Sequence, residues 1–241
     1  MTAAPPAAAR FYYSAPAPCP YVSGRVERRI FADLSGPHAS FSYDLLSEAG
    51  FRRSLGFAYR PACPGCNACV PVRIPVREFR WTRGWRRVIA NNQDLEVRWA
   101  PARATSEQYQ LFNRYQRSRH GDGDMARMDF GDFRTMVEVG AIDSAVAEFR
   151  SADGQLVAAS LADRMARGFS AVYSFFDPAL AARSLGSRAI LWLVEQAQAD
   201  GLDHVYLGYW IADSRKMAYK ARFRPLEGLT RDGWRTLGDA A

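Results

Sequence analysis

Four cysteines are the residues whose spacing most directly suggests chemistry. Cys63, Cys66 and Cys69 follow one another with two residues in each gap, and Cys19 lies farther back as a fourth. Thiolates at such short gaps can share one centre, and a set of four suits zinc or an iron–sulfur cluster. The alternative is a tight turn, "CPGCNAC", whose reduced thiols pack as small apolar groups. Both interpretations stay open at the level of the sequence.

A second pattern with chemical potential is "SFFDPALAARSLGSRAI", in which a loop leads into a long helix. The first N–H groups of a helix lack partners within it, so its N-terminus attracts anions. We predict that Arg183, Ser184, Leu185 and Gly186 form such an entrance. The alternative is that Ser184 or Ser187 only caps the helix.

Composition indicates a globular protein with an anionic partner. The 241 residues include 32 Lys+Arg against 25 Asp+Glu, a formal net charge of +7, and arginine far outnumbers lysine. The planar fork of arginine suits phosphate and carboxylate, so RNA is a reasonable partner, although such charge can also serve solubility alone. The hydrophobic content of 48% excludes a disordered chain.

The sequence shows no sign of a membrane partner or of secretion. Its longest apolar runs, such as "AILWLVEQA", are far shorter than the roughly 20 residues that a bilayer crossing requires. The start, "MTAAPPAAARFYYSAPAP", lacks the basic-then-apolar order of a secretory signal, and we predict residues 1–18 to be a flexible extension. A cytoplasmic location is therefore expected, which also argues against structural disulfides.

The elements that position these residues can be predicted from periodicity and turn residues. A short helix should end at Gly50, and "VPVRIPVREFRW" alternates as an edge strand would, because Pro71 and Pro75 disfavour a central place in a sheet. "TRGWRRVIANNQDL" follows as a basic helix or loop, and "EVRWAPA" as a strand. Pro101 and an N-cap at Thr105 or Ser106 then suggest a domain boundary near residue 103.

The second part, 104–241, shows a helix-rich start, an antiparallel meander, a long helix and a further strand. The meander is predicted from "SAVAEFRS", "QLVAASLADRMA" and "GFSAVYSFFD", the helix from "SRAILWLVEQAQADG" and the last strand from "HVYLGYW". This order is the layout of the GNAT-like acyltransferase domain. The predicted class is α+β, with a largely antiparallel mixed sheet preceded by a small cysteine-bearing α/β domain over 19–103.

Four separated stretches carry a resemblance to a known family: "CPYVSGRVERRIF", "GFRRSLGFAYRPACPGCNACVPVRIPV", "AVYSFFDPALAARSLGSRAILWLVEQA" and "HVYLGYWIADSRKMAYKARFRPLE". Together they resemble the arginyl-tRNA–protein transferase family, and more closely its bacterial branch, the aspartate/glutamate leucyltransferases. The resemblance implies transfer of leucine from leucyl-tRNA to acceptor proteins that begin with Asp or Glu, which marks them for degradation. It names aminoacyl-tRNA and such acceptors as partners, with no membrane and no DNA.

The resemblance also implies roles for individual residues. Candidate donors to the developing oxyanion are the backbone N–H groups near Leu185 and Gly186 or the hydroxyls of Tyr206, Tyr209 and Tyr219, although tyrosines in an apolar strand are more often core residues. The transfer is aminolysis of an activated ester, so positioning can supply much of its rate and no cofactor is required. The iron–sulfur cluster or zinc on the cysteine set stays optional, and His38, His120 and His204 lie in no nucleophile motif.

Arginines are predicted to contribute to binding of both anionic substrates, the acceptor carboxylate and the tRNA. Arg60 and Arg73, with Tyr59 as a wall, are the candidates for the acceptor carboxylate, unless they are ordinary solvated arginines. Candidate tRNA ligands are the helix entrance at 183–186, Lys220, and Trp85 with Arg86 in the basic stretch "RWTRGWRRV". The loop "RSRHGDGDMARMD" is expected near the donor.

Other functions remain possible from the sequence. Arginyl transfer from arginyl-tRNA to the same acceptors is one. A CoA-dependent GNAT N-acetyltransferase is another, although "ARSLGSRA" is poorer in glycine than the usual pyrophosphate loop. A zinc-ribbon RNA-binding module would need a second Cys-x-x-Cys pair, which is missing.

Overall fold

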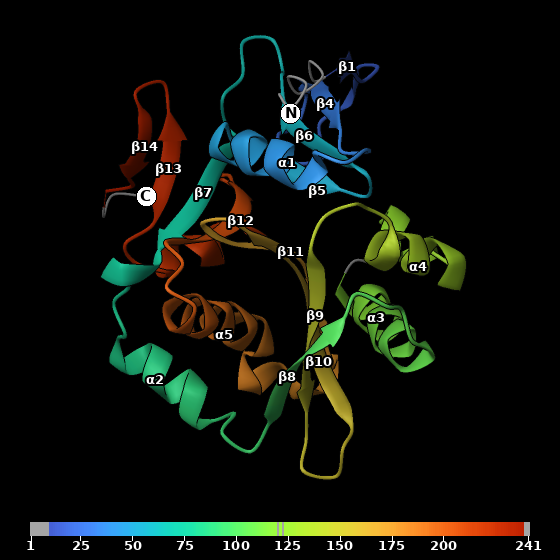
Figure 1. Ribbon diagram of the computed structural model, residues 1–241, viewed down its shortest axis with the longest axis vertical. Helices are drawn as coiled ribbons and strands as arrows, with labels where there is room; N and C mark the ends of the chain where they lie inside the picture. Colours follow the sequence, from blue (N-terminus) through green and yellow to red (C-terminus); the bar gives the residue numbers. More distant parts are fainter. Residues whose placement is uncertain (1–9, 120, 122, 239–241) are drawn as a thin grey trace, which may run out of the picture.

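The computed structural model describes residues 10–119, 121 and 123–238, and its largest feature is a mixed sheet (Figure 1). Within the described residues this sheet has eight strands in the order β14-β13-β7-β12-β11-β10-β9-β8. Their bounds are β7 Val70–Pro75, β8 Glu96–Pro101, β9 Ser144–Arg150, β10 Leu156–Met165, β11 Gly168–Phe176, β12 His204–Trp210, β13 Glu227–Thr230 and β14 Gly233–Thr236.

Strand directions in the large sheet match the layout predicted from the sequence. Strands β8 to β11 form an antiparallel meander, and β12 returns parallel to β11 after helix α5 (Leu185–Ala199) crosses over. The parallel ladder pairs only Gly168–Ser170 with His204–Tyr206, after which the two strands stop pairing. The predicted α+β, GNAT-like architecture with a largely antiparallel sheet is confirmed.

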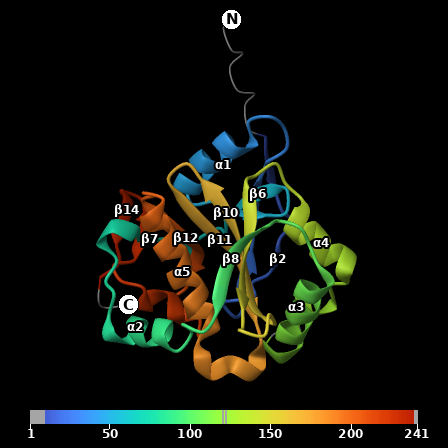
Figure 2. The ribbon, with the colours of Figure 1, turned by 60° about the horizontal axis from the view of Figure 1, so that its bottom comes forward.

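Helices cover both faces of this sheet (Figure 2). Helices α5 and α2 (Arg83–Ala90) lie on one face, and α3 (Ser106–Arg119) and α4 (Phe130–Glu138) lie on the other. Each face has its own core, built on one side around Leu191 and Leu193 of α5 and on the other around Phe112 and Phe133. The buried residues of α3 and α4 recur at helical spacing and form one stripe, whereas α5 is buried on all sides over residues 188–194.

Helix starts follow the chemistry of the caps. The Thr82 hydroxyl accepts a hydrogen bond from the Trp85 N–H at 3.3 Å, which starts α2. Thr105 and Gln108 bond each other's backbone N–H groups ahead of α3, so the predicted N-cap region is confirmed. Four short 3₁₀ segments join the main elements in the described chain: η1 Val76–Glu78, η2 Asp124–Arg127, η3 Pro178–Arg183 and η4 Ala218–Arg222.

A smaller N-terminal layer packs on the upper end of the large sheet in Figure 1. Its strands form a four-stranded sheet and a two-stranded sheet, with helix α1 (Ala39–Glu48) beside them. The strands are β1 Phe11–Tyr13, β4 Arg29–Asp33, β6 Phe57–Pro61 and β5 Arg52–Ser54 in the first sheet, and β2 Ala17–Pro18 with β3 Val26–Glu27 in the second. The predicted helix end at Gly50 is confirmed, since α1 stops two residues earlier and Gly50 has φ +82°.

Buried polar contacts fix the N-terminal layer to the large sheet. The Arg53 guanidinium donates to both carboxylate oxygens of Asp163 on β10, at 2.7 and 2.8 Å, and both side chains are almost fully buried. The Tyr43 hydroxyl donates to Ser170 on β11 at 3.0 Å. Breaking a fully buried ion pair of this kind typically costs about 3–5 kcal/mol, so the two layers are held rigidly together.

The prediction of an edge strand after the cysteines was wrong. Strand β7 lies inside the large sheet between β12 and β13. Its ladder to β13 covers only Val72 and Arg73, so neither Pro71 nor Pro75 pairs with that neighbour. Proline is therefore accommodated in an interior strand because the second ladder is only two residues long.

The large sheet also extends beyond the second predicted domain. Strands β7 and β8 precede the predicted boundary near residue 103, yet both pair with strands that follow it. The predicted flexible extension is wrong for residues 11–18, because β1 pairs with β4 and β2 pairs with β3. Residues 1–9 of that extension lie outside the described residues.

Candidate functional site

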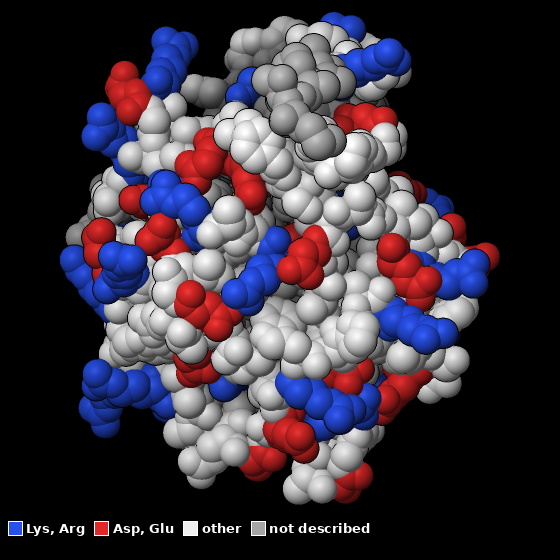
Figure 3. All heavy atoms as spheres, in the orientation of Figure 1, with Lys and Arg blue, Asp and Glu red and all other residues white. Residues whose placement is uncertain are grey.

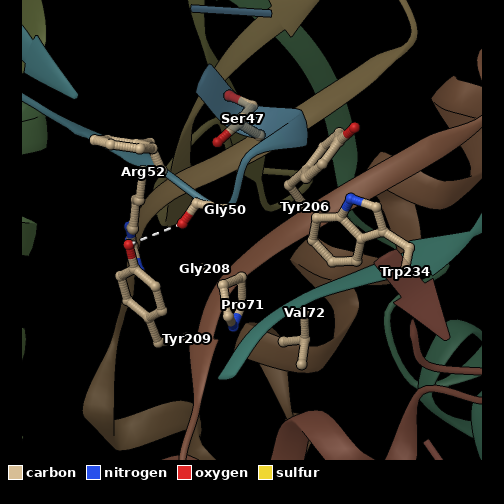
Figure 4. Close-up of a pocket in the computed structure, with 11 residues that line it drawn as sticks. Ser47, Gly50, Arg52, Pro71, Val72, Tyr206, Gly208, Tyr209 and Trp234 are labelled. Carbon is tan, nitrogen blue, oxygen red and sulfur yellow. Dashed lines mark hydrogen bonds between the residues drawn. The ribbon is translucent and has the colours of Figure 1, made fainter. Parts of the chain in front are cut away.

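A pocket opens where the N-terminal layer meets the large sheet (Figure 4). The end of α1 and the start of β5 form one wall, and β7 and β12 form the floor. Figure 4 shows Arg52 and Tyr209 at one end and Tyr206 with Trp234 at the other. The lining residues are Ser47, Gly50, Phe51, Arg52, Pro71, Val72, Ser170, Tyr206, Gly208, Tyr209 and Trp234. Arg52 is the one charged residue in this set.

An ion-pair cluster closes the Tyr206 end. Arg73 on β7 binds Glu48 of α1 at 2.9 Å and Glu227 of β13 at 2.7 Å, and its guanidinium lies 4.2 Å from the ring centroid of Trp234. Burial would raise the pKa of Glu48, but the Tyr206 hydroxyl and Arg73 lower it overall. The positive charge of Arg73 is thus already balanced inside the protein.

This pairing changes how Arg73 could meet an acceptor. The prediction that Arg73 reads the acceptor carboxylate requires that carboxylate to replace Glu48 or Glu227 on the guanidinium. Arg60, the other predicted reader, is exposed, donates to the Ala49 carbonyl at 3.1 Å and lies over the ring of Phe51. Neither arginine lines the pocket.

The three candidate tyrosines have different surroundings. Tyr206 donates its hydroxyl proton to Glu48 and accepts from Arg73 at 3.3 Å. The Tyr209 hydroxyl is held by the carbonyls of Gly50 at 3.0 Å and Tyr59 at 2.8 Å, and burial raises its pKa far above the ordinary value. Tyr219 is 41% exposed and makes no side-chain hydrogen bond among the described residues. Of the three, Tyr219 keeps a hydroxyl that is free to donate.

The predicted wall residue Tyr59 lies between the pocket and the cysteines. Its ring packs against Tyr209 with centroids 5.9 Å apart, and Arg29 lies over its ring at 5.4 Å. Tyr59 and Tyr209 both line a second pocket that contains all four cysteines. The cysteine loop therefore lies directly behind the wall of the first pocket.

The four cysteines gather as the sequence predicts, with all thiols free. Cys19 accepts a hydrogen bond from the Val22 N–H and Cys63 from the Arg28 N–H, each at 3.4 Å. Burial and the other three thiols raise the pKa of Cys69 to about 11. Within the described residues no three Cys, His, Asp or Glu side chains are arranged to hold a metal ion. Zinc or an iron–sulfur cluster on the cysteine set stays a prediction.

The predicted anion site at the start of α5, residues 183–186, is occupied by contacts within the protein. Arg183 donates a hydrogen bond to Asn92 at 3.1 Å and forms an ion pair with Asp94. Its charge is therefore neutralised by a residue just after α2. Ser184 is the N-cap with φ +55° but its hydroxyl makes no cap hydrogen bond, and Leu185 is fully buried. A Cβ on Gly186 would lie 3.0 Å from the Phe176 ring. This site is packed against protein and does not present a free cation.

The prediction that Trp85 stacks on an RNA base was wrong. Trp85 is buried and stacks on Phe223, with ring centroids 4.6 Å apart and an interplanar angle of 13°. The guanidinium carbon of Arg222 lies 5.0 Å from the centroid of the Trp85 ring. The amphipathic alternative explains it, because α2 turns this ring into the core and leaves Arg86 exposed. Arg86 remains available to a phosphate, and its role stays a prediction.

Lys220 is also placed where a polynucleotide phosphate does not reach. Lys220 is 5% exposed, and its ammonium donates to the Tyr209 carbonyl at 2.5 Å. Burial, and then the charge of Arg52, lower the pKa of Lys220 to about 7. The expected phosphate contact is therefore not supported by this position.

Surface charge gives no continuous basic face in the view of Figure 3, where Lys and Arg alternate with Asp and Glu. The predicted donor loop is described only in part, because His120 and residue 122 lie outside the described residues. Among the described residues no helix is both long and apolar enough to cross a bilayer.

Of the residues that line the pocket, only Tyr206 and Tyr209 were predicted from the sequence, and the missed ones include Arg52 and Trp234. Arg52 stands in the stretch "GFRRSLG", next to the buried Arg53, and Trp234 comes from the last strand. The paired arginines were a visible signal, but only packing shows which one is neutralised. No local pattern distinguishes Trp234 from an ordinary strand aromatic.

Comparisons with known proteins agree with the residues that carry the resemblance. The family models described as arginine-tRNA-protein transferase, N terminus and C terminus, match residues 17–87 and 107–230. A relative from Paramagnetospirillum magneticum, named aspartate/glutamate leucyltransferase, is 56% identical over 96% of this chain and 96% of its own length. One of the same name from Granulibacter bethesdensis is 54% identical over 95% of this chain and 86% of its own.

A solved structure gives a weaker likeness. The GCN5-related glucosamine N-acetyltransferase region of a fungal multi-domain enzyme aligns with 84% of this chain and 22% of that chain, at 9% identity and a TM-score of 0.41. A score this low carries no argument, so the fold class rests on the strand topology.

The meander, the crossover helix and the parallel return strand define the fold class, a GNAT-like acyltransferase fold. Within that class, the two family models together match well over half of the chain. The chain belongs to the arginine-tRNA-protein transferase family.

Proposed function

We propose that the protein transfers leucine from leucyl-tRNA to the N-terminal Asp or Glu of acceptor proteins, creating an N-terminal degradation signal. The observation that carries this proposal is the match over nearly the whole chain to relatives named aspartate/glutamate leucyltransferase. The pocket between the two layers supports it, because it offers a cation, aromatic walls and hydroxyls in one place. Since aminoacyl-tRNA is made in the cytoplasm, the proposed reaction places the protein there.

The reaction is an aminolysis. The acceptor's α-amino nitrogen attacks the ester carbonyl of leucyl-tRNA, a C–N bond forms, and the bond to the terminal ribose oxygen breaks. The proton lost by the amine ends on that oxygen. An α-amino group has a pKa near 8, so a useful fraction is already neutral at pH 7 and no strong base is needed. Positioning of two bound substrates supplies much of the rate.

The chain's own residues have defined tasks in this proposal. The Tyr219 hydroxyl, which has no partner among the described residues, is proposed as the donor to the developing oxyanion. Tyr209 is proposed to position the end of α1 and the Tyr59 strand, because its single proton is shared between their carbonyls. Tyr206 is proposed to hold Glu48 beside Arg73.

No cofactor is required for transfer in this proposal, and we expect leucyl transfer to continue after dialysis against a chelator. The raised pKa of Cys69 predicts that its thiol stays protonated at pH 7.5 and reacts slowly with iodoacetamide in metal-free protein. Residue-by-residue mass spectrometry measures this. If the chelator instead releases zinc or iron and all four thiols become reactive together, the cysteines hold a metal.

The transfer assay tests the function directly. Purified protein is given leucyl-tRNA or arginyl-tRNA, labelled on the amino acid, together with peptides that begin with Asp, Glu, Asn or Lys. We expect leucine to be added to the Asp and Glu peptides alone. Labelling by arginine would identify the arginyl alternative, and no labelling of any peptide by any aminoacyl-tRNA would reject the proposed function.

A further inference from the structure

The strongest unassigned feature is a cation placed where two parallel strands separate. Strands β11 and β12 pair only up to Ser170 and Tyr206. Beyond this point Arg52 of β5 enters from the N-terminal layer, and its Nη2 donates to the Val172 carbonyl of β11. On the other side it lies against Gly208 of β12, where an added Cβ would collide with Nη1 and lie 3.0 Å from Cδ.

The backbone of β12 is adapted to this guanidinium. Gly208 has φ +74°, and the β12–β7 register shifts between Tyr206 and Gly208. A residue with a side chain would be strained at this φ and would also displace Arg52. Glycine at this position therefore lets the backbone approach Arg52 closely, which holds the guanidinium in one place.

The charge of Arg52 has no counter-charge among the described residues. In that part of the chain neither Arg52 nor the nearby Lys220 makes an ion pair, and their hydrogen bonds go to the backbone carbonyls of Val172 and Tyr209. The buried arginines elsewhere are matched, with Arg53 on Asp163 and Arg188 on Glu195 as examples. Burying unpaired charge is costly, so an arginine without a counter-charge in a pocket indicates that a ligand supplies the anion.

The surroundings of Arg52 indicate a small anion. Burial alone would lower the pKa of Arg52, and the nearby hydroxyls of Tyr59, Tyr43, Tyr219 and Tyr209 offset this. Ser47, which lines the same pocket, has a buried hydroxyl with no hydrogen-bond partner among the described residues. A hydroxyl without a partner, such as that of Ser47, beside a guanidinium suits a carboxylate, which accepts several hydrogen bonds at once.

Covalent geometry requires the residue that binds the acceptor's side-chain carboxylate to lie near the reacting α-amino group. In a chain that begins with Asp or Glu, the side-chain carboxylate lies roughly 4–6 Å from the α-amino nitrogen. Because that nitrogen must reach the ester carbonyl, the cation that binds the carboxylate has to lie next to the reaction centre. Arg52 lines the pocket, whereas Arg60 and Arg73 do not.

We propose that Arg52 binds the side-chain carboxylate of the acceptor's N-terminal Asp or Glu. The inference rests on the proposed leucyl transfer. The Nη2 of Arg52 donates to the Val172 carbonyl, and its other N–H groups can donate to the ligand. Because the guanidinium is charged, it favours the carboxylate of Asp over the neutral amide of Asn. A phosphate of the tRNA is the competing ligand, and the experiment separates the two.

The test compares Arg52→Gln and Arg52→Lys with Arg77→Gln, a control that removes an exposed arginine paired at the surface with Asp203. Leucyl transfer is measured with peptides that begin with Asp and with Asn, and leucyl-tRNA binding is measured by filter binding. For Arg52→Gln we expect kcat/KM for the Asp peptide to fall on the order of 10- to 100-fold, the loss of one charge-assisted hydrogen-bond pair. For Arg52→Lys, kcat/KM for the Asp peptide should lie between the values for wild type and Arg52→Gln. Leucyl-tRNA binding should not change in either variant.

Two results would overturn the proposal. One is an unchanged Asp:Asn preference in folded Arg52→Gln, and the other is a matching loss of leucyl-tRNA binding, which would assign Arg52 to the tRNA. If the wild type transfers no leucine at all, the proposed function fails instead, and the two failures are thereby distinguished.

A measurement on the wild-type protein removes dependence on variant folding. Phenylglyoxal modifies accessible guanidinium groups, and mass spectrometry reports the modification of Arg52 alone. We expect the Asp peptide to protect Arg52 and the Asn peptide not to protect it at equal concentration. Equal protection by both peptides, or none by either, would contradict carboxylate binding at Arg52.

Discussion

Arg73 and Arg52 approach the same pocket region from two ends and differ in how their charge is balanced. Arg73 is held by Glu48 and Glu227, which come from α1 and β13, so it fastens three elements together. Arg52 contacts the Val172 carbonyl and Gly208, and no acid of the described chain pairs with it. A balanced buried arginine serves the fold, and an unbalanced one is left for a ligand.

The immediate neighbour of Arg52 sharpens this difference. Arg53 points to the opposite side of β5, as successive strand residues do, and reaches Asp163 in the core. Two consecutive arginines therefore have opposite roles because the strand turns one to a buried acid and the other to the pocket. Sequence alone offers no means of telling them apart.

The largest expected effect follows from displacing Arg52 without removing its charge. Gly208→Ala puts a methyl group where Nη1 lies, so kcat/KM for the Asp peptide should fall on the order of 100-fold, the usual result of misplacing a group by about 1 Å. The control is Gly201→Ala, since Gly201 has φ +68° but open space around it. Equal losses in both variants would mean that strain in the backbone, and not Arg52, explains the effect.

The next largest effect is a difference in the free energy of unfolding between Arg73→Gln and Arg52→Gln. Arg73→Gln leaves Glu48 and Glu227 without their cation and should lower the free energy of unfolding by about 2–3 kcal/mol, below the full cost of a buried pair because Glu48 is 40% exposed. Arg52→Gln removes an unpaired cation and should change stability by less than about 1 kcal/mol. Urea unfolding monitored by fluorescence measures both. A larger loss for Arg52→Gln would reverse the roles assigned to the two arginines.

A pH-dependent effect is expected at Lys220. Its folded pKa, about 7, is lower than its unfolded value of 10.5, so between these values the unfolded chain binds more protons and stability rises with pH. Lys220→Met removes this penalty, so the variant should melt at a higher temperature than wild type at pH 6 and lose that advantage between pH 7 and 10. Thermal melts across this range test it, and a gain that is independent of pH would show that packing is responsible.

The smallest effect should come from Glu48. Its folded pKa is lowered by Tyr206 and Arg73 against the opposing effect of burial, so it stabilises the fold above its unfolded value of 4.5 and loses this as pH falls through the folded pKa. Glu48→Gln should therefore cost up to about 1 kcal/mol at pH 7, the range of a partly exposed ion pair, and less at pH 3. Glu96→Gln, at an exposed position, is the control.

Much of the fold could be predicted from local pattern. Helix α5 and the meander of β9, β10 and β11 have long, strongly periodic segments, and their order predicted the acyltransferase layout. The interior place of β7 could not be predicted, because two prolines argue against it and only the shortness of its β13 ladder permits it. The same limit applied to Trp85, whose basic neighbours suggested a surface residue while the helix turns its ring inward.

The candidate site was predicted in outline and changed in detail. The cysteine loop, Tyr59 and Tyr209 do meet around one wall. The arginine that lines the pocket is Arg52, however, and the predicted Arg73 and Arg183 are both paired with acids from distant segments. Charge pairing across more than 80 residues has no signature in local spacing.

The sequence by itself determined the family, the order of elements and the set of arginines, tyrosines and cysteines available to the site. These follow from motifs and periodicity, which are local properties of the chain. Only the tertiary structure decided which cations are neutralised and which face a ligand. That decision depends on the distance between charges far apart in the sequence, and on backbone conformation at a single glycine, Gly208, that lets a guanidinium lie between two strands.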